Sequence, residues 1–484
     1  MFLLLKFFLC GVLTSFLFPP FFLTPIGFLI FPYLVYLLNA NKKILNYKSH
    51  FFVGFLYGLG FFSFFLLWLK EPFLLDVNTE KYAFFSYALI FYCSIYFGFI
   101  FFIIKFFKRF LFKILLLPTL IVLSEFMCSN FLYGFPWFSF ALINSNNSLG
   151  TTLIFYLGSY GLSYISILIF LLPSTFLLIN KKDKIILYLI ASILFIFILL
   201  LFLMKNFTDK DIKTESFSVL IAQLNYSSNQ HLSLAEKNTK LKKITEVISN
   251  YDSEIIIFSE NEFPYLMDKK SINFLQSKLR DNQKLIIGST REQSLQFYNS
   301  LYLIHKNYYK KFDKKILVPF GEFIPLRSYF GFMDFIAGSF DFSRGSDERH
   351  LRLEENYNIL PVICYEIVYF WKLLQANNTN IIINITNDSW FGDFLGPYQH
   401  FYFTKLRAAE FNKPIIRVSS NGVSGLIDDN GSIKSFIKLN KNGLMKMEVI
   451  KSGIKKNYLL FHKFFFLIII FSLLIFLFLN KKDE

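Results

Sequence analysis

The stretch PVICYEIV, residues 361–368, ends an apolar, β-branched run at Cys364 and then continues with an acidic residue. The run NILPVIC, residues 358–364, has the composition of a buried strand. Around it, short apolar runs alternate with segments of helical spacing, which predicts a layered α/β domain. Cys364 is one of four cysteines in the chain, and no other lies near it. Without a partner for an intradomain disulfide, it is either buried and inert or chemically reactive.

Three chemically reactive side chains lie just past, or between, the predicted strands of this domain. Glu260 follows the run 254–258, Lys314 lies in a loop with two prolines, and Cys364 ends its own strand. Because sites assemble at strand ends in open α/β sheets, we expect the three to meet. The remaining predicted elements are strands at 218–225, 284–290, 300–305, 380–386 and 414–420, a helix at 235–251, a second helix after Cys364, and the loop 312–325.

These three residue types together could perform acyl transfer. A thiol needs help to act as a nucleophile at neutral pH: a neighbouring carboxylate can accept its proton, and a lysine can stabilise the oxyanion that forms on attack. A helix that begins after Cys364 would also favour the thiolate. Taken alone, Glu260 and Lys314 would be read as ordinary loop residues. The sequence has no convincing metal-ligand cluster or nucleotide-binding loop, so no metal or cofactor is expected.

The composition outside this domain is that of a membrane protein. Of the 484 residues, 54% are hydrophobic and 67 are phenylalanine. Apolar runs near the ~20 residues that span a bilayer occur at 2–18, 21–39, 51–69, 83–104, 111–128, 151–179, 185–204 and 459–479. We therefore predict a membrane bundle over 1–205, a large domain over 206–458, and an eighth span with a short tail over 459–484. Glu125, near the outer end of the fifth span, is expected at a lipid headgroup or in interfacial water.

The basic residues in the loops predict the orientation of the chain. They lie between spans two and three, four and five, and six and seven, and after span eight: Lys42, Lys43, Lys48, Lys105, Lys108, Arg109, Lys113, Lys181, Lys182, Lys184, Lys481 and Lys482. Because positive loops stay in the cytoplasm, both termini are predicted inside and the domain 206–458 outside. The net charge of +16 does not indicate nucleic-acid binding, since no basic stripe is interleaved with stacking aromatics.

Several motifs carry a resemblance to a known family. IIIFSENEFP (255–264), DKKILVPFGEFIP (313–325), ICYE (363–366), NITNDSWFGDFLGPYQH (384–400) and RAAEFNKPIIRVSSNG (407–422) resemble the nitrilase superfamily of carbon–nitrogen hydrolases. More narrowly, they resemble the apolipoprotein N-acyltransferase family of the bacterial inner membrane. FPPFFLTPIGFL (18–29) and GFPWFSFAL (134–142) resemble that family's membrane part, so the resemblance covers nearly the whole chain in the expected order.

The resemblance implies a fold, a site and a reaction. The fold would be a polytopic helical bundle of about eight spans plus a nitrilase-like αββα sandwich. Glu260 would be the base, Lys314 the oxyanion donor and Cys364 the nucleophile. Supporting roles would fall on Glu322, Tyr365, Glu366 and Trp390. Leu232 stands where the family often has tryptophan, which puts a substrate contact there in doubt.

The implied reaction moves an acyl chain from a phospholipid, through a cysteine thioester, to the free α-amine of an apolipoprotein's N-terminal diacylglyceryl-cysteine. It needs no cofactor, and the catalytic domain would lie on the periplasmic side of the inner membrane.

Two other classes remain open. A membrane-anchored amidase or nitrilase would use the same three residues with water as acceptor, although one helix would suffice to anchor it. A non-enzymatic sensor or transporter is disfavoured because the spans carry almost no charge. The sequence predicts no oligomeric state.

Overall fold

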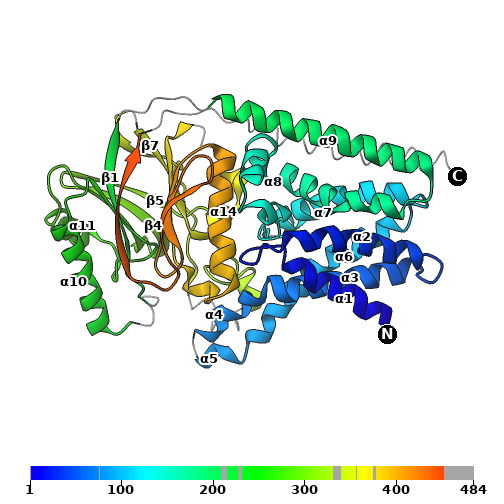
Figure 1. Cartoon of the computed structure of the whole chain (residues 1–484). Helices are drawn as coiled ribbons and strands as arrows, with labels where there is room; N and C mark the ends of the chain where they lie inside the picture. The colour runs from blue at the N-terminus through cyan, green and yellow to red at the C-terminus, as the bar shows by residue number, and fades with distance from the viewer. Residues whose placement is uncertain are drawn as a thin grey trace. The chain divides into compact units, whose positions relative to one another are not determined.

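The computed structural model describes residues 2–75, 77–208, 215–226, 232–330, 340–355, 357–373 and 378–451 (Figure 1). The chain divides into two compact units. The first holds the described residues up to 70 and from 82 to 208, and the second holds those of 71–81 and 215–451. The predicted eighth span, 459–479, lies outside the described residues.

The first unit is helical. Four of its described helical segments are long and apolar enough to cross a membrane: Ala83–Ile104, Phe110–Asn130, Ser148–Leu177 and Lys181–Met204. A fifth candidate is the pair Tyr47–Phe65 and Leu67–Leu74, which is bent by 65° and whose last four residues belong to the second unit. The α-helices of the first unit are α1 (Phe2–Ser15), α2 (Gly27–Ala40), α3 (Tyr47–Phe65), α6 (Ser86–Ile104), α7 (Phe110–Asn130), α8 (Ser148–Leu171) and α9 (Lys181–Thr208).

The first two predicted spans are shorter than the sequence suggested. The helices there cover Phe2–Ser15 and Thr24–Ala40, too short to count among the candidate spans. The physical reason is the segment FPPFFLTP (18–25), because proline lacks the N–H that would continue a helix. Pro19 and Pro20 therefore hold the chain in a turn, and helical structure resumes at Thr24.

Small residues bring the helices of this unit into close contact. A Cβ added at Gly11 of α1 would lie 2.0 Å from the Tyr57 carbonyl oxygen of α3. One added at Gly54 of α3 would lie 2.3 Å from the Phe97 carbonyl oxygen of α6. Only glycine permits backbones to approach this closely, so these positions set the packing of α1, α3 and α6.

Glu125 of α7 meets neither of its two expected environments. Its side chain is buried within the protein, and both carboxylate oxygens are hydrogen-bonded. Oε1 accepts the Phe140 backbone N–H at 2.7 Å, and Oε2 accepts the Ser163 hydroxyl of α8 at 2.9 Å. The hydrogen bonds of Glu125 tie the loop 134–144 to α7 and α8. Because both carboxylate oxygens are paired, the buried acid is tolerated there.

The second unit contains two six-stranded sheets among its described residues. The first has the order β12-β1-β2-β3-β4-β5, and its strands are β1 (Ser216–Gln223), β2 (Ile255–Phe258), β3 (Lys284–Gln293), β4 (Gln296–His305), β5 (Tyr308–Asp313) and β12 (Gly443–Ile450). The second has the order β11-β10-β9-β8-β7-β6, and its strands are β6 (Leu351–Glu354), β7 (Tyr357–Ile363), β8 (Ile381–Thr386), β9 (Ile415–Ser419), β10 (Ser424–Ile427) and β11 (Ile433–Ile437).

The two sheets form the centre of an α/β sandwich. β1 contacts β9 and β4 contacts β7, so the sheets face each other. Helices α10 (Leu234–Asn250) and α11 (Lys269–Gln276) cover the first sheet, and α14 (Leu395–Phe411) covers the second (Figure 1). Ile244 and Ile248 of α10 pack on Leu220 and Ile256 of the first sheet in a fully apolar core. The short helices α4 (Glu71–Leu74), α5 (Val77–Glu80) and α12 (Arg327–Phe330) complete this unit.

Parallel strands place the carboxyl ends of neighbouring strands at one edge of each sheet. β1, β2 and β3 are parallel, with Val219 paired to Ile255 and Ile255 to Lys284. β7, β8 and β9 are also parallel, with Ile359 paired to Ile381. The residues that follow β2, β7 and β8 therefore gather where side chains of both sheets can meet.

Candidate active site

The three predicted reactive residues meet between the two sheets. Glu260 lies two residues beyond β2, Lys314 directly follows β5, and Cys364 directly follows β7. Lys314 Nζ lies 3.4 Å from Glu260 Oε1, and the Glu260 carboxylate hydrogen-bonds the Cys364 side chain. All three side chains are buried, so the cluster is shielded from bulk water and its charges interact strongly.

Cys364 has an unusual backbone. Its φ is +52°, a left-handed conformation that costs a non-glycine residue on the order of 1–3 kcal/mol. The predicted helix EIVYFWKLLQAN (366–377) is wrong over its described residues, because Cys364–Val368 and Phe370–Lys372 are short 3₁₀ helices; residues 374–377 lie outside the described residues. A helix N-terminus therefore does not help to ionise this thiol.

The surroundings of the Cys364 thiol favour its protonated form. Burial raises the pKa of the Cys364 thiol above its ordinary value, and the Glu260 carboxylate raises it further. The Lys314 ammonium opposes both effects without outweighing them. Since only the thiolate is nucleophilic, attack requires a base beside the thiol, and the Glu260 carboxylate is in contact with it.

Glu260 is held on both carboxylate oxygens. Oε1 accepts from Asn299 Nδ2 at 2.7 Å, and Oε2 accepts from the Asn387 backbone N–H at 2.8 Å. Burial raises the pKa of Glu260, while the Lys314 charge lowers it, and the net effect is a raised pKa. A carboxylate of raised pKa is a stronger proton acceptor, which is what a general base requires.

Lys314 is held as a charged group by two acids. Its Nζ lies 2.9 Å from Glu322 Oε1 in addition to the contact with Glu260. Burial alone would lower the pKa of Lys314, but Glu322 and Glu260 raise it above its ordinary value. Glu322 is itself fixed, since its Oε2 accepts the Val318 backbone N–H at 2.9 Å. A fixed positive charge here can stabilise an oxyanion that develops on an attacked carbonyl.

Glu366 holds the lysine loop against the strand end that carries the cysteine. Its Oε1 accepts the backbone N–H groups of Lys315 and Ile316 at 2.8 and 3.0 Å, and its Oε2 accepts that of Ile363 at 3.0 Å. Arg349 donates to both oxygens at 2.6 and 2.7 Å. Burial would raise the pKa of Glu366, but Arg349 lowers it below its ordinary value.

Of the other predicted supporting residues, Tyr365 directly follows Cys364, whereas Trp390 lies in a separate segment. Tyr365 is buried, and its ring packs edge-on against Tyr369 at 5.2 Å. Trp390 is half-buried in a short 3₁₀ helix, Asp388–Phe391, that follows β8. Leu232 is 9% exposed, consistent with an apolar packing position.

Sequence reasoning missed several residues that hold the cluster: Asn299, Asn387, Asp388, Arg349 and Arg417. Asn299 lies inside β4, where nothing distinguishes it from other strand residues. Asp388 and Asn387 follow β8 directly, so the strand-end rule that found Cys364 could have found them too. Arg349 and Arg417 carry no local signal, because their partners are distant in sequence.

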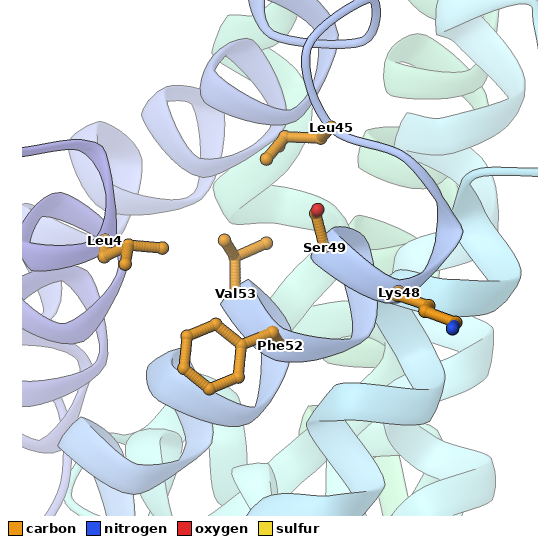
Figure 2. A pocket seen from close by; sticks show the side chains of 6 residues that line it. All are labelled: Leu4, Leu45, Lys48, Ser49, Phe52 and Val53. Atoms are coloured by element: carbon orange, nitrogen blue, oxygen red, sulfur yellow. The ribbon is translucent and has the colours of Figure 1, made fainter. Parts of the chain in front are cut away.

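The described residues contain no group of three His, Cys, Asp or Glu side chains placed to bind a metal ion. A pocket of about 380 Å³ lies in the helical unit. Leu4 of α1 faces Phe52 and Val53 of α3 across it, and Leu45, Lys48 and Ser49 complete its lining (Figure 2). None of these six residues belongs to the predicted site.

Comparison with known proteins gives two family matches. Residues 10–172 match the apolipoprotein N-acyltransferase N-terminal domain, and residues 220–455 match the carbon–nitrogen hydrolase family. The chain is 33% identical to an apolipoprotein N-acyltransferase from Wigglesworthia glossinidia brevipalpis, over 68% of each chain. It is 28% identical to the enzyme of that name from Rickettsia typhi, over 90% of this chain and 89% of the relative.

Two further similarities each cover less than half of this chain. An apolipoprotein N-acyltransferase from Allorhizobium ampelinum is 32% identical over 44% of this chain and 43% of its own length. A crystal structure of a carbon–nitrogen hydrolase superfamily protein from Xanthomonas campestris is 14% identical, with a TM-score of 0.35, over 49% of this chain and 91% of that one.

Proposed function

The chain belongs to the apolipoprotein N-acyltransferase family, and we propose that it transfers an acyl chain from a phospholipid to the N-terminal cysteine of apolipoproteins. The donor would be a phospholipid ester, and the acceptor the free α-amine of a diacylglyceryl-cysteine. The observation that carries this proposal is the buried contact of Glu260, Lys314 and Cys364. These residues supply a base, an oxyanion donor and a nucleophile.

In the first half-reaction, Glu260 accepts the Cys364 proton while Sγ attacks the ester carbonyl carbon of the phospholipid. The carbonyl oxygen becomes an oxyanion that the Lys314 ammonium stabilises. The intermediate then collapses, the ester C–O bond breaks, and Glu260 returns the proton to the departing lysophospholipid. The acyl chain remains on Cys364 as a thioester.

In the second half-reaction, the α-amine of the acceptor attacks the thioester carbonyl. Glu260 removes a proton from the attacking nitrogen, and Lys314 again meets the oxyanion. The C–S bond breaks to give an amide, and the thiolate recovers the proton from Glu260. Glu322 fixes Lys314, and Glu366 fixes the loop that carries it.

A membrane setting suits two lipid substrates. We propose eight spans, in which the short helices Phe2–Ser15 and Thr24–Ala40 serve as the first two, with the bundle over 1–205, the catalytic domain over 206–458, and the last span and tail over 459–484. Following the distribution of Lys and Arg, both termini would be cytoplasmic and the catalytic domain periplasmic. Trp390 and Tyr365 are the residues we would place nearest the entering substrates.

The experiment that tests this function supplies the detergent-solubilised full chain with a phospholipid of defined acyl chains and a synthetic diacylglyceryl-cysteine peptide. Mass spectrometry should find the peptide heavier by one acyl chain, with lysophospholipid in equal amount. Free fatty acid without acylated peptide would instead indicate a hydrolase. No lysophospholipid at all would contradict both. Cys364→Ala serves as the control for background transfer.

A further inference from the structure

A second buried cluster lies behind the proposed nucleophile. His400, on α14, places its Nε2 3.3 Å from the Cys364 carbonyl oxygen. A carbonyl oxygen can only accept, so this ring nitrogen is the donor. The other ring nitrogen, Nδ1, lies 3.2 Å from Arg417 Nη2 and 2.8 Å from Asp388 Oδ1. With its proton on Nε2, the neutral ring accepts from Arg417 through Nδ1, so the imidazole joins the Arg417–Asp388 ion pair to the backbone of the residue that carries the thiol.

Several hydrogen bonds fix the Asp388 carboxylate in place. Its Oδ2 accepts from Arg417 Nη2 at 2.7 Å and from the Ser419 hydroxyl at 3.1 Å, and its Oδ1 accepts from the Thr386 hydroxyl at 3.2 Å. The side chains of Asp388, His400 and Arg417 are fully buried. Gly422 approaches so closely that an added Cβ would lie 1.9 Å from Asp388 Oδ2.

The cluster reaches the cysteine in two ways. His400 binds the Cys364 carbonyl, and the Thr386 hydroxyl hydrogen-bonds the Cys364 side chain while also contacting Asp388. Cys364 needs such support because its φ of +52° is intrinsically unfavourable and persists only when surrounding contacts enforce it. The backbone conformation of Cys364 also sets the direction of its Cβ, and so the position of Sγ relative to Glu260 and Lys314.

We propose that Asp388 and His400 are positioning residues for the nucleophile, holding Cys364 in its left-handed conformation so that Sγ meets Glu260. The inference rests on the proposed role of Cys364 and deepens it. His400 contacts Cys364 through its backbone oxygen. Its removal should therefore misplace the thiol without altering how strongly phospholipid binds.

The test compares three variants of the detergent-solubilised full chain. His400→Phe fills the space without a donor, whereas His400→Gln keeps an amide N–H that can reach the Cys364 carbonyl. Leu406→Ala removes buried apolar bulk from the same helix outside the cluster and controls for lost stability. The readouts are the single-turnover rate of thioester formation from dioleoyl phosphatidylethanolamine, its half-saturating lipid concentration, and alkylation of Cys364 by iodoacetamide.

We expect His400→Phe to slow thioester formation about 10²-fold, the scale of a small misplacement of a reacting group. In His400→Phe, the half-saturating lipid concentration should stay unchanged, and the rate at which iodoacetamide alkylates Cys364 should differ from that of the wild type. His400→Gln should recover most of the rate of thioester formation. Leu406→Ala should lower the melting temperature and keep the wild-type rate. A wild-type rate in His400→Phe, an equal loss in His400→Gln, or an equal loss in Leu406→Ala would overturn the proposal.

A Cys364→Ala arm separates this failure from failure of the proposed function. If Cys364→Ala still forms an acyl-enzyme, the nucleophile is misassigned and the proposed function fails with it. If Cys364→Ala is inactive while His400→Phe behaves as wild type, only the positioning role is wrong.

Discussion

Replacing Glu366 by glutamine should destabilise the protein strongly, although the shape of the side chain is kept. The wild-type carboxylate accepts from three backbone N–H groups and pairs with Arg349. Arg349 is 2% exposed and Glu366 is 0% exposed, so solvent cannot compensate the charge that remains. Removing one partner of a buried ion pair typically costs about 3–5 kcal/mol.

That cost should appear as a fall in the melting temperature. For a domain of this size, each kcal/mol shifts the melting temperature by about 2–4 °C, so we expect a loss of roughly 6–20 °C. The matched control is Glu354→Gln, whose carboxylate lies 2.9 Å from Lys451 at a site 34% exposed. A pair this exposed contributes about 1 kcal/mol or less. Because Glu366 also fixes the loop that carries Lys314, its replacement should slow thioester formation as well.

The stabilisation by the Glu366 carboxylate should also depend on pH. Arg349 holds the pKa of Glu366 below its ordinary value. The stability from the charged carboxylate is then fully present above the unfolded pKa of about 4.3 and is lost as pH falls through the folded pKa. The difference in melting temperature between wild type and Glu366→Gln should stay constant from neutral pH down to about 5.5 and shrink below about 4. A difference under 2 °C at pH 7, or one that widens in acid, would refute the reasoning.

Two further predictions concern the catalytic roles and the orientation. Glu260→Gln should slow thioester formation by about 10²–10⁴-fold and recover partly at alkaline pH, where the thiol ionises without a base. Lys314→Met should slow thioester formation by about 10²–10³-fold without such recovery. Alkaline rescue of Lys314→Met alone would mean that the roles of Glu260 and Lys314 are reversed. In spheroplasts, a membrane-impermeant thiol reagent should label Ser294→Cys and not Ile44→Cys, since the four native cysteines are buried; the opposite pattern would overturn the predicted orientation.

The parts of the fold that follow from local pattern could be predicted from the sequence. Strands at 254–258, 358–364 and 380–386 are apolar, β-branched runs, and they agree with β2, β7 and β8 to within a residue. The rule that sites form at strand ends then selects Glu260 and Cys364 without knowledge of the fold. β5, by contrast, is not among the predicted strands, and its last two residues fall in the predicted loop 312–325, because YYKKFD has two lysines and little apolar character.

The features that depend on tertiary contacts could not be predicted. The left-handed backbone of Cys364 is enforced from outside its own segment, so the helical pattern after it was misleading. Arg349 and His400 find their partners only when distant segments pack together. Glu125 was expected at a lipid or water boundary, because the sequence does not show that Ser163 and the Phe140 N–H would satisfy it.

The central claim is that Cys364 carries the acyl group, and the most direct test is mass spectrometry of the enzyme itself. Purified full-length protein is incubated with a phospholipid of defined acyl chains in the absence of acceptor, then digested and analysed. The account predicts that the peptide containing Cys364 gains the mass of one acyl chain and loses it on treatment with hydroxylamine. An unmodified Cys364 peptide despite release of lysophospholipid, or an acyl group on another residue that persists in Cys364→Ala, would contradict it.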